Sequence, residues 1–366
     1  MPKISLKYIE DASDRTIELR EAEIAPLGFD DLARMADKLN QPISFPLRLS
    51  GVRVSQNEFE DLDGQTVKSV IAPLDSTLGS TTIGLVNGGW LPSGFTSGDS
   101  LLLPDRCTVA AIRSRFLGGV RKDGPHDDFL DFLVDQPIRI NPMLCAIEGV
   151  NGRTAPSESE LSALFDKVAK GIQEALPHAV IFPEKSAVMQ GALGLIRDAA
   201  ESFALKQKFL LKAAPLLAPS IGRAKRPELF SQLFELALEC GIGTASMLMV
   251  TVLSAASANQ NLNPAKKLLK PKKQYTKGDA YNALSDLRAL DLLIASCTDF
   301  PDLRVALLTD DKALALLWSG LQAHSFKRSG SAIRYSINAH RALFSGLADD
   351  ELKSMWERAT NSRQAR

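Results

Sequence analysis

A chain of 366 residues, 45% of them hydrophobic, is long enough to bury a full core. It is expected to hold two domains, since one domain usually takes about 100–200 residues. Its 43 basic and 43 acidic residues balance, so the total charge neither indicates nor excludes a nucleic-acid partner. Cys107, Cys145, Cys240 and Cys297 form no Cys-x-x-Cys pair, which excludes a zinc knuckle or disulfide framework and predicts free thiols in a reducing cytoplasm.

Residues 1–95 are expected to form a small β-rich module of unassigned role. Partial alternation of apolar and polar residues predicts short strands, over 3–9, 15–25, 44–55, 66–73 and 81–88. One helix is expected among them, from Phe29 to Leu39. The first 100 residues hold 15 acidic and 9 basic side chains, so the rest of the chain is net basic, which suits a site for an anionic substrate. A stretch rich in Gly, Pro and Ser after Val86 marks the expected domain boundary.

Two apolar segments are each followed at once by a carboxylate and then by helical spacing. The first, Ser100 to Leu103, ends at Pro104 and Asp105. The second, Val305 to Leu308, is followed by Thr309, Asp310 and Asp311. Uninterrupted apolar runs of this length are typical of strands buried on both faces of a parallel sheet. Acids at the carboxyl ends of such strands lie where open α/β sheets bind their ligands.

Further acids are expected on helices. A helix beginning at Asn141 carries Glu148 between apolar neighbours, and the residue is compatible both with an exposed position and with projection into the same cleft. A helix beginning at Gly278 carries Asp286 and Asp291 among leucines at three- and four-residue steps.

Between these helices the spacing predicts a helical region. Its helices are expected over 158–175, 184–214, 227–240 and 244–258, and a polar helix over 349–358 closes the chain. No charged residue occurs from Cys240 to Ala265, but the apolar side chains there are diluted by Thr, Ser and Asn, so a buried core helix is favoured over a membrane span. The N-terminus lacks the apolar core of a signal peptide, and a cytoplasmic protein without membrane contact is expected.

Six lysines lie close together without an intervening acid, just before the helix at Gly278: Lys266, Lys267, Lys270, Lys272, Lys273 and Lys277. Two readings stay open. The run is either a solvated linker or a surface that contacts a phosphate backbone beside the cleft.

Asp105, Glu148, Asp291 and Asp311 form the set of acids that a divalent-cation site for phosphodiester hydrolysis requires. Hard cations take oxygen ligands, and bound Mg²⁺ or Mn²⁺ lowers the pKa of a bound water and neutralises charge on the phosphate. The alternative reading treats these residues as helix caps and surface acids.

The motifs resemble those of PIN-domain nucleases. Leu103-Pro-Asp105 is similar to their first strand and aspartate, and Asp291-Leu-Leu-Ile-Ala-Ser resembles the start of their acidic helix. Val305-Ala-Leu-Leu-Thr309-Asp-Asp311-Lys-Ala-Leu314 resembles their strand followed by Thr-x-Asp-x-x-Leu. The resemblance implies a PIN-like α/β fold, a parallel sheet flanked by helices. It also implies a cleft that binds Mg²⁺ or Mn²⁺ and endonucleolytic cleavage of RNA.

By that resemblance Asp105, Glu148, Asp291 and Asp311 hold the metal and are the catalytic residues, while Thr309 orients the strand-end acid. Asp286 competes with Asp291 for the third position, and Asp310 with Asp311. Asp291 is preferred because the apolar residues after it match the family pattern better. If Asp105, Asp291 and Asp311 do not converge, catalysis in this form is excluded.

The expected organisation is a β-rich module over 1–95, a PIN-like nuclease domain over 96–346 with a helical insertion at about 155–262, and a C-terminal helix and tail over 347–366. The favoured function is a metal-dependent endoribonuclease, of the kind that serves as a bacterial toxin or defence effector. The alternative is a catalytically inactive PIN-like scaffold that binds RNA or a protein partner. The expected partners are an RNA substrate, an inhibitory or regulatory protein and, through the helical insertion, a second copy of the chain.

Overall fold

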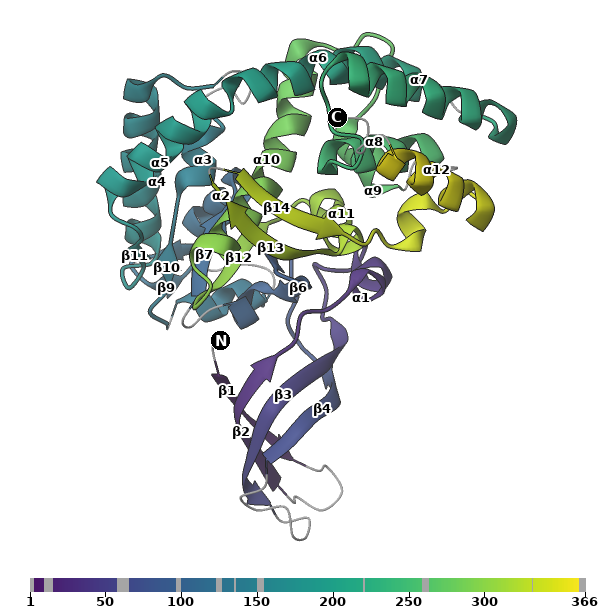
Figure 1. The fold of residues 1–366 in the computed structure, drawn as a ribbon. Coiled ribbons are helices and arrows are strands. Elements are labelled where there is room, and N and C mark those ends of the chain that lie inside the picture. The colour runs from purple at the N-terminus through teal and green to yellow at the C-terminus, as the bar shows by residue number, and fades with distance from the viewer. Residues whose placement is uncertain are drawn as a thin grey trace.

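A computed structural model describes most of the chain (Figure 1). The described residues are 3–9, 16–57, 66–96, 100–122, 127–134, 136–149, 155–219, 221–258, 263–330 and 332–361. The strands are β1 (Lys3–Ile9), β2 (Thr16–Ile24), β3 (Ser44–Asn57), β4 (Thr66–Asp75), β5 (Ile83–Val86), β6 (Gly89–Pro92), β7 (Ser100–Pro104), β8 (Phe116–Leu117), β9 (Val120–Arg121), β10 (Arg139–Ile140), β11 (Val180–Ile181), β12 (Arg304–Thr309), β13 (Ala323–Ser329) and β14 (Ala332–Ile337).

The α-helices are α1 (Phe29–Met35), α2 (Arg106–Arg115), α3 (Met143–Ile147), α4 (Glu158–Ala175), α5 (Lys185–Asp198), α6 (Ala200–Leu217), α7 (Arg226–Glu239), α8 (Met247–Ser257), α9 (Pro264–Leu269), α10 (Lys277–Asp299), α11 (Lys312–Leu321) and α12 (Asp349–Asn361). Short 3₁₀ helices are η1 (Ser93–Thr96), η2 (Phe129–Leu133), η3 (Arg223–Lys225) and η4 (Arg341–Phe344).

An N-terminal antiparallel sheet, in the order β1-β2-β3-β4, projects from the rest of the molecule (Figure 1). In β3 the residues Phe45, Leu47 and Leu49 are buried and alternate with less buried neighbours, the period of a strand with one face in a core. The alternation shifts by one residue at Gly51, whose φ of +61° suits a residue without Cβ. The β-rich character expected for this region is therefore confirmed.

The second sheet has six strands in the order β11-β10-β7-β12-β5-β6. The strands β11, β10, β7 and β12 run parallel, whereas β5 and β6 are antiparallel to their neighbours. In chain order the parallel strands stand as third, second, first and fourth, so the winding direction reverses between β7 and β12. Open α/β sheets bind ligands beyond the carboxyl ends of the strands at such a reversal.

The expectation of an α/β fold is confirmed, but the sheet is mixed rather than wholly parallel. The strand predicted over 81–88 belongs to the central sheet as β5, pairing with β12 through Thr309 and Ile83. The division between the two sheets therefore falls between Asp75 and Ile83, earlier than the boundary expected at residue 95. Short apolar strands can join either sheet, and only long-range pairing decides which.

The helices between β11 and β12 differ from the expected ones at two points, one of which is α9, a helix that was not predicted at the start of the lysine run. The predicted helix over 184–214 is divided into α5 and α6 at Ala199. All eleven residues of α8 are buried inside the protein, as expected for a core helix. Within the described part of the chain, no helix has the combination of length and hydropathy needed to cross a membrane. The hairpin of β13 and β14 was not predicted.

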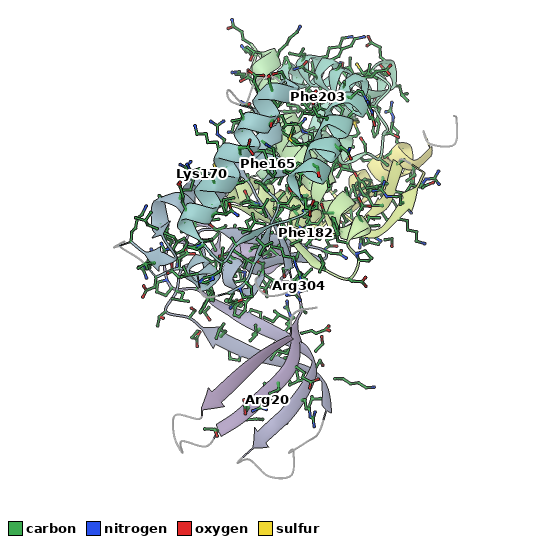
Figure 2. The ribbon with its side chains drawn as sticks, turned by 90° about the vertical axis from the view of Figure 1, so that its left-hand side faces the viewer. Arg20, Phe165, Lys170, Phe182, Phe203 and Arg304 are labelled. Carbon is green, nitrogen blue, oxygen red and sulfur yellow. The ribbon has the colours of Figure 1, made fainter. Side chains whose placement is uncertain are left out.

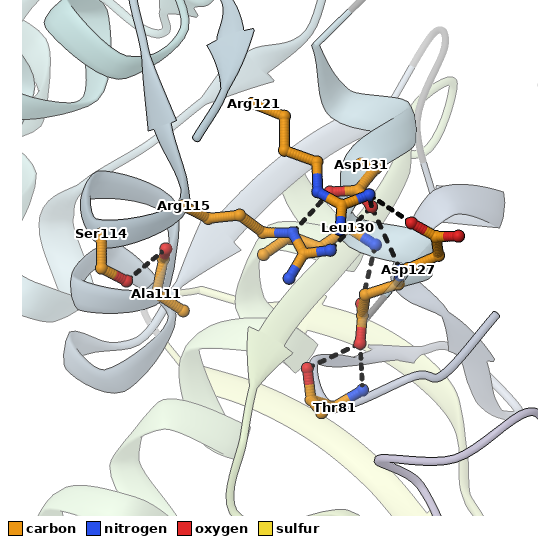
Figure 3. A network of polar contacts seen from close by, with 9 residues as sticks. Thr81, Ala111, Ser114, Arg115, Arg121, Asp127, Leu130 and Asp131 are labelled. Atoms are coloured by element: carbon orange, nitrogen blue, oxygen red, sulfur yellow. Dashed lines mark hydrogen bonds and ion pairs between the residues drawn. The ribbon is translucent and has the colours of Figure 1, made fainter. Parts of the chain in front are cut away.

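A hydrogen bond and a set of ion pairs connect the central sheet and its helices to neighbouring segments. Arg304 at the start of β12 donates to the carbonyl oxygen of Ile24 at 2.9 Å, which ties β12 to the N-terminal sheet (Figure 2). Arg115 and Arg121 pair with acids of the segment Asp127–Asp131, beside the buried Asp128 (Figure 3). These ion pairs hold η2 against the end of α2.

Candidate functional site

Asp105 is positioned by the junction of β7 and α2. It is the N-cap of α2, and its Oδ1 accepts a hydrogen bond from the backbone N–H of Thr108 at 2.7 Å. Its own N–H donates to the carbonyl oxygen of Leu308 at 2.9 Å, so the residue is registered against the end of β12. Burial raises the pKa of Asp105, and the charge of Asp311 raises it further.

Thr309 links the two strand ends. Its fully buried hydroxyl accepts from the N–H of Asp311 at 3.0 Å and hydrogen-bonds to the Asp105 carboxylate. Asp311 caps α11, with its Oδ1 accepting from Ala313 and Leu314 N–H at 2.7 and 3.0 Å. Asp105 and Asp311, the acids that the sequence analysis selected after two strands, therefore each cap the helix that follows. The hydroxyl of Thr309 hydrogen-bonds to both residues.

Asp310 is hydrogen-bonded to the segment that precedes β5. Its Oδ1 accepts from the hydroxyl of Thr82 at 2.7 Å. The preceding Thr81 donates through its N–H and hydroxyl to Asp128 at 2.9 and 2.7 Å, as Figure 3 shows. Burial raises the pKa of Asp310 to about 6. Its carboxylate is therefore tied to the segment before β5, and the charge of Asp105 also raises its pKa. The charge of Asp311 raises the pKa of Asp105 and of Asp286 on α10.

Glu148 follows α3, which starts soon after β10, the strand next to β7. Burial and the neighbouring charge of Asp105 raise its pKa to about 7, while Arg106 and Arg288 lower it. A carboxyl that is half-buried beside another acid favours the protonated form. The effect of Asp105 places its carboxylate near that of Glu148.

Asp286 supplies the fourth acid from the middle of α10. Burial raises its pKa to about 8, and the charges of Asp311, Glu148 and Asp105 add to the shift, while Lys270 opposes it. The four acids belong to four separate segments, and the charges of the other three all act on Asp286. Coulombic coupling of this kind requires the groups to lie near one another in a partly desolvated environment.

Asp291 does not join this group. Its Oδ2 lies 3.7 Å from the Nζ of Lys206 on α6, and Tyr335 of β14 hydrogen-bonds to it. It lines a separate cavity together with Leu284 and Leu287 of its own helix. The preference for Asp291 over Asp286 as the third acid is therefore not supported by the geometry. The reason is helical periodicity: five residues turn the side chain to the opposite side of α10.

Cationic side chains surround the acids. Arg106 follows Asp105 directly, Arg288 lies two positions beyond Asp286, and Lys270 ends α9 in the left-handed conformation. The first two lower the pKa of Glu148 and the third lowers that of Asp286, so all three are close to the carboxylates. The sequence analysis had named Lys270 as part of the lysine run, but it had not named Arg106 or Arg288. These two arginines could have been found because each lies within two residues of an acid of the site.

The donor set consists of carboxylate oxygens, the ligands that Mg²⁺ and Mn²⁺ take. Among the residues that the structure describes, no three His, Cys, Asp or Glu side chains form a group that could hold a metal ion as they stand. The site is thus an acidic edge with cations around it. No family model, curated protein or solved structure matches this chain.

Proposed function

We propose that the chain is a metal-dependent endoribonuclease that hydrolyses RNA phosphodiester bonds at the edge where β7 and β12 end. One observation carries the proposal. Asp105, Glu148, Asp286 and Asp311 come from four segments to the point where the winding of the parallel strands reverses. The charge of Asp311 raises the pKa of Asp105 and of Asp286, and the charge of Asp105 raises the pKa of Glu148. Four acids held at mutual electrostatic cost are typical of a functional site.

The divalent cation and the protein side chains have different roles in this reaction. Asp105, Glu148, Asp286 and Asp311 would hold Mg²⁺ or Mn²⁺, and the bound ion would supply positive charge that offsets their repulsion and lowers the pKa of a water. Arg106, Arg288 and Lys270 bind the phosphate oxygens of the strand, because a phosphodiester is anionic and these cations flank the acids. The backbone N–H of Thr108 and the hydroxyl of Thr309 keep the carboxylate of Asp105 oriented.

The test uses labelled single-stranded and structured RNA with Mg²⁺ or Mn²⁺, comparing the wild type with Asp311→Asn. An asparagine retains an oxygen that can accept the two capping hydrogen bonds, so the variant is expected to fold. Asp302→Asn is the matched control, since Asp302 is exposed beyond the opposite end of β12. We expect metal-dependent cleavage by the wild type and the control, and its loss in Asp311→Asn.

Absence of cleavage by the folded wild type with either metal would overturn the proposal. The alternative is then a catalytically inactive scaffold that binds RNA or a protein partner. The observation that favours this alternative is that no described group of acids is arranged as a ready metal site. RNA binding by the same samples in EDTA distinguishes an RNA-binding scaffold from a protein-binding one.

A further inference from the structure

The six lysines that precede most of α10 lie in residues 266–277, which we call the lysine segment. This segment is folded onto the protein. Asn263 is the N-cap of α9, and Thr276 is the N-cap of α10. Between the two helices the side chain of Tyr275 is buried, and its hydroxyl donates to the carbonyl oxygen of Leu269 at 2.9 Å. The backbone that carries the lysines is therefore held in place at both ends and in the middle.

The lysines of this segment point outward. On α9, Leu268 and Leu269 are buried, whereas Lys267 and Lys270 are exposed. The helical period of about 3.6 residues places the lysines on the side opposite to the leucines. Exposed lysines continue beyond α9: Lys272, Lys273 and Lys277. The segment thus presents a row of positive charges to solvent.

Few acids compensate these charges. The helices α8, α10 and α11 pack against α9, and α8 and α11 contain no acidic residue. Within the described part of the chain, one ion pair involves the segment, between Nζ of Lys272 and Asp279 of α10 at 2.8 Å. Lys266 and Lys270 are one helical turn apart, so two like charges are neighbours. An anionic partner on this surface would offset the repulsion.

The lysine segment adjoins both helices that bear acids of the candidate site. The helix α9 packs against α11, which Asp311 caps, and against α10, which carries Asp286 (Figure 1). Asp279, the partner of Lys272, lies seven residues before Asp286. Seven residues are about two helical turns, so the two aspartates lie on one side of α10, about 10 Å apart along its axis. The row of lysines therefore begins on the side of α10 that carries the site acid.

We propose that the lysine segment binds the phosphate backbone of the RNA strand whose scissile phosphodiester lies at the acidic edge. The inference rests on the proposed nuclease function and adds a surface that holds the substrate outside the reaction site. A lysine ammonium binds a phosphate as a point charge and does not read the base. Binding to this surface is therefore independent of base sequence and falls steeply as salt rises.

The test measures RNA binding without catalysis. In EDTA, a labelled single-stranded RNA is titrated with the full chain at sodium chloride concentrations from about 50 to about 200 mM, the range over which phosphate contacts change affinity most clearly. The variant is Lys267→Gln/Lys273→Gln, which leaves Lys270 in place. The matched control is Lys167→Gln/Lys170→Gln, which removes two exposed lysines from α4 (Figure 2).

The logarithm of the wild-type association constant should fall linearly with the logarithm of the salt concentration. Lys267→Gln/Lys273→Gln should make this slope shallower by about 1.4, since each phosphate contact of a single strand contributes about 0.7. Affinity should fall about tenfold, about threefold for each exposed charge pair. The control should keep the wild-type slope and affinity. The melting temperature of the double variant should stay within about 2 °C of the wild type, because both side chains are exposed.

A slope and an affinity that Lys267→Gln/Lys273→Gln leaves unchanged would overturn the inference. A lowered melting temperature with unchanged binding would do so as well, and would assign these lysines to stabilising the C-terminus of α9, where cations interact favourably with the helix dipole. Equally tight binding of a polyglutamate of the same net charge would also count against it, because the surface would then suit an acidic protein rather than RNA.

Cleavage assays separate this failure from failure of the nuclease proposal. With Mn²⁺, the double variant should need about tenfold more RNA for its half-maximal rate, while the rate at saturation stays within about twofold of the wild type. Metal-dependent cleavage with unchanged RNA binding by the double variant would leave the nuclease without this surface. Salt-dependent binding that the double variant weakens, in a chain that cleaves no RNA, would support the lysine surface while the nuclease proposal failed.

Discussion

Two aspartates on α10 have opposite surroundings although they are five residues apart. Asp286 faces Asp311, Glu148 and Asp105, and its pKa rises to about 8. Asp291 lies on the other side of the helix, 3.7 Å from Lys206, and its side chain is 41% exposed. Burial raises the pKa of both acids, but the neighbouring charges act in opposite directions: acids raise the pKa of Asp286 further, whereas Lys206 lowers that of Asp291.

The comparison shows that the protonation and pairing of an aspartate depend on its neighbours more than on its residue type. Both aspartates are followed by leucine and lie on the same apolar helix. What separates them is whether the element packed against their side of α10 contributes acids or a lysine. A carboxyl placed among acids at electrostatic cost is a candidate for function, whereas a paired one is a candidate for a structural role.

The largest expected effect is on RNA cleavage, when Asp286 and Asp291 are each replaced by asparagine in separate variants. Under the proposed function, Asp286→Asn should reduce metal-dependent RNA cleavage by about a hundredfold or more, because it removes a charge from the metal-binding set. Asp291→Asn should stay within a few-fold of the wild type. Single-turnover cleavage rates and Mn²⁺ binding by calorimetry measure both effects. The reverse ranking would restore Asp291 to the acid set and refute the assignment made from the geometry.

A smaller effect is expected on the pH dependence of stability without metal. Glu148 and Asp286 have pKa values of about 7 and about 8, above the values near 4 that such groups have in an unfolded chain. Between those limits the folded state binds more protons than the unfolded state, so stability must fall as pH rises. The melting temperature in EDTA should drop by several degrees between about pH 5.5 and 8.5.

In Asp286→Asn the drop should be shallower, because one of the two groups no longer titrates. Asp302→Asn should show the same slope as the wild type. Adding Mn²⁺ should raise the melting temperature most at high pH, where the carboxylates are charged. A wild-type melting temperature that is flat or rises over this range would contradict the raised pKa values.

The smallest effect is expected at the ion pair of Asp291. Lys206→Gln should lower the free energy of unfolding by less than about 1 kcal/mol, since both side chains are about a third exposed or more. Urea unfolding measures the change, and RNA cleavage should be unaffected. A loss of several kcal/mol would mean that the substitution leaves an uncompensated buried charge, and that Asp291 depends on Lys206 far more than an exposed pair would.

Local features of the sequence were enough to predict several parts of the structure. Ser157 is the N-cap of α4, and Ser157 and Glu160 form the expected capping box. The apolar runs before Asp105 and Asp311 form neighbouring parallel strands, and each acid caps the following helix. These features depend on contacts within a few residues, or on the burial of a continuous apolar run, and both can be recognised in the sequence.

The membership of β5 in the central sheet could not be predicted in this way. Its four residues pair with β12, more than two hundred residues later in the chain. The sequence of a short apolar strand does not indicate which other strand it pairs with. The hairpin of β13 and β14 was missed for a different reason. In β14 the half-buried Ile333, Tyr335 and Ile337 alternate with exposed residues, but β13 is mostly exposed and shows no such alternation, so the pairing is not evident from the sequence.

The sequence by itself determined the units of the candidate site: two strand ends with an acid and a helix, a glutamate on a further helix, and aspartates on a long helix. Only the tertiary structure decided that Asp286 rather than Asp291 faces the other acids, and that α9 with its lysines packs against α10 and α11. The physical reason is that a helix presents every side of itself to some neighbour, and the charge of that neighbour is set by segments far away in the chain.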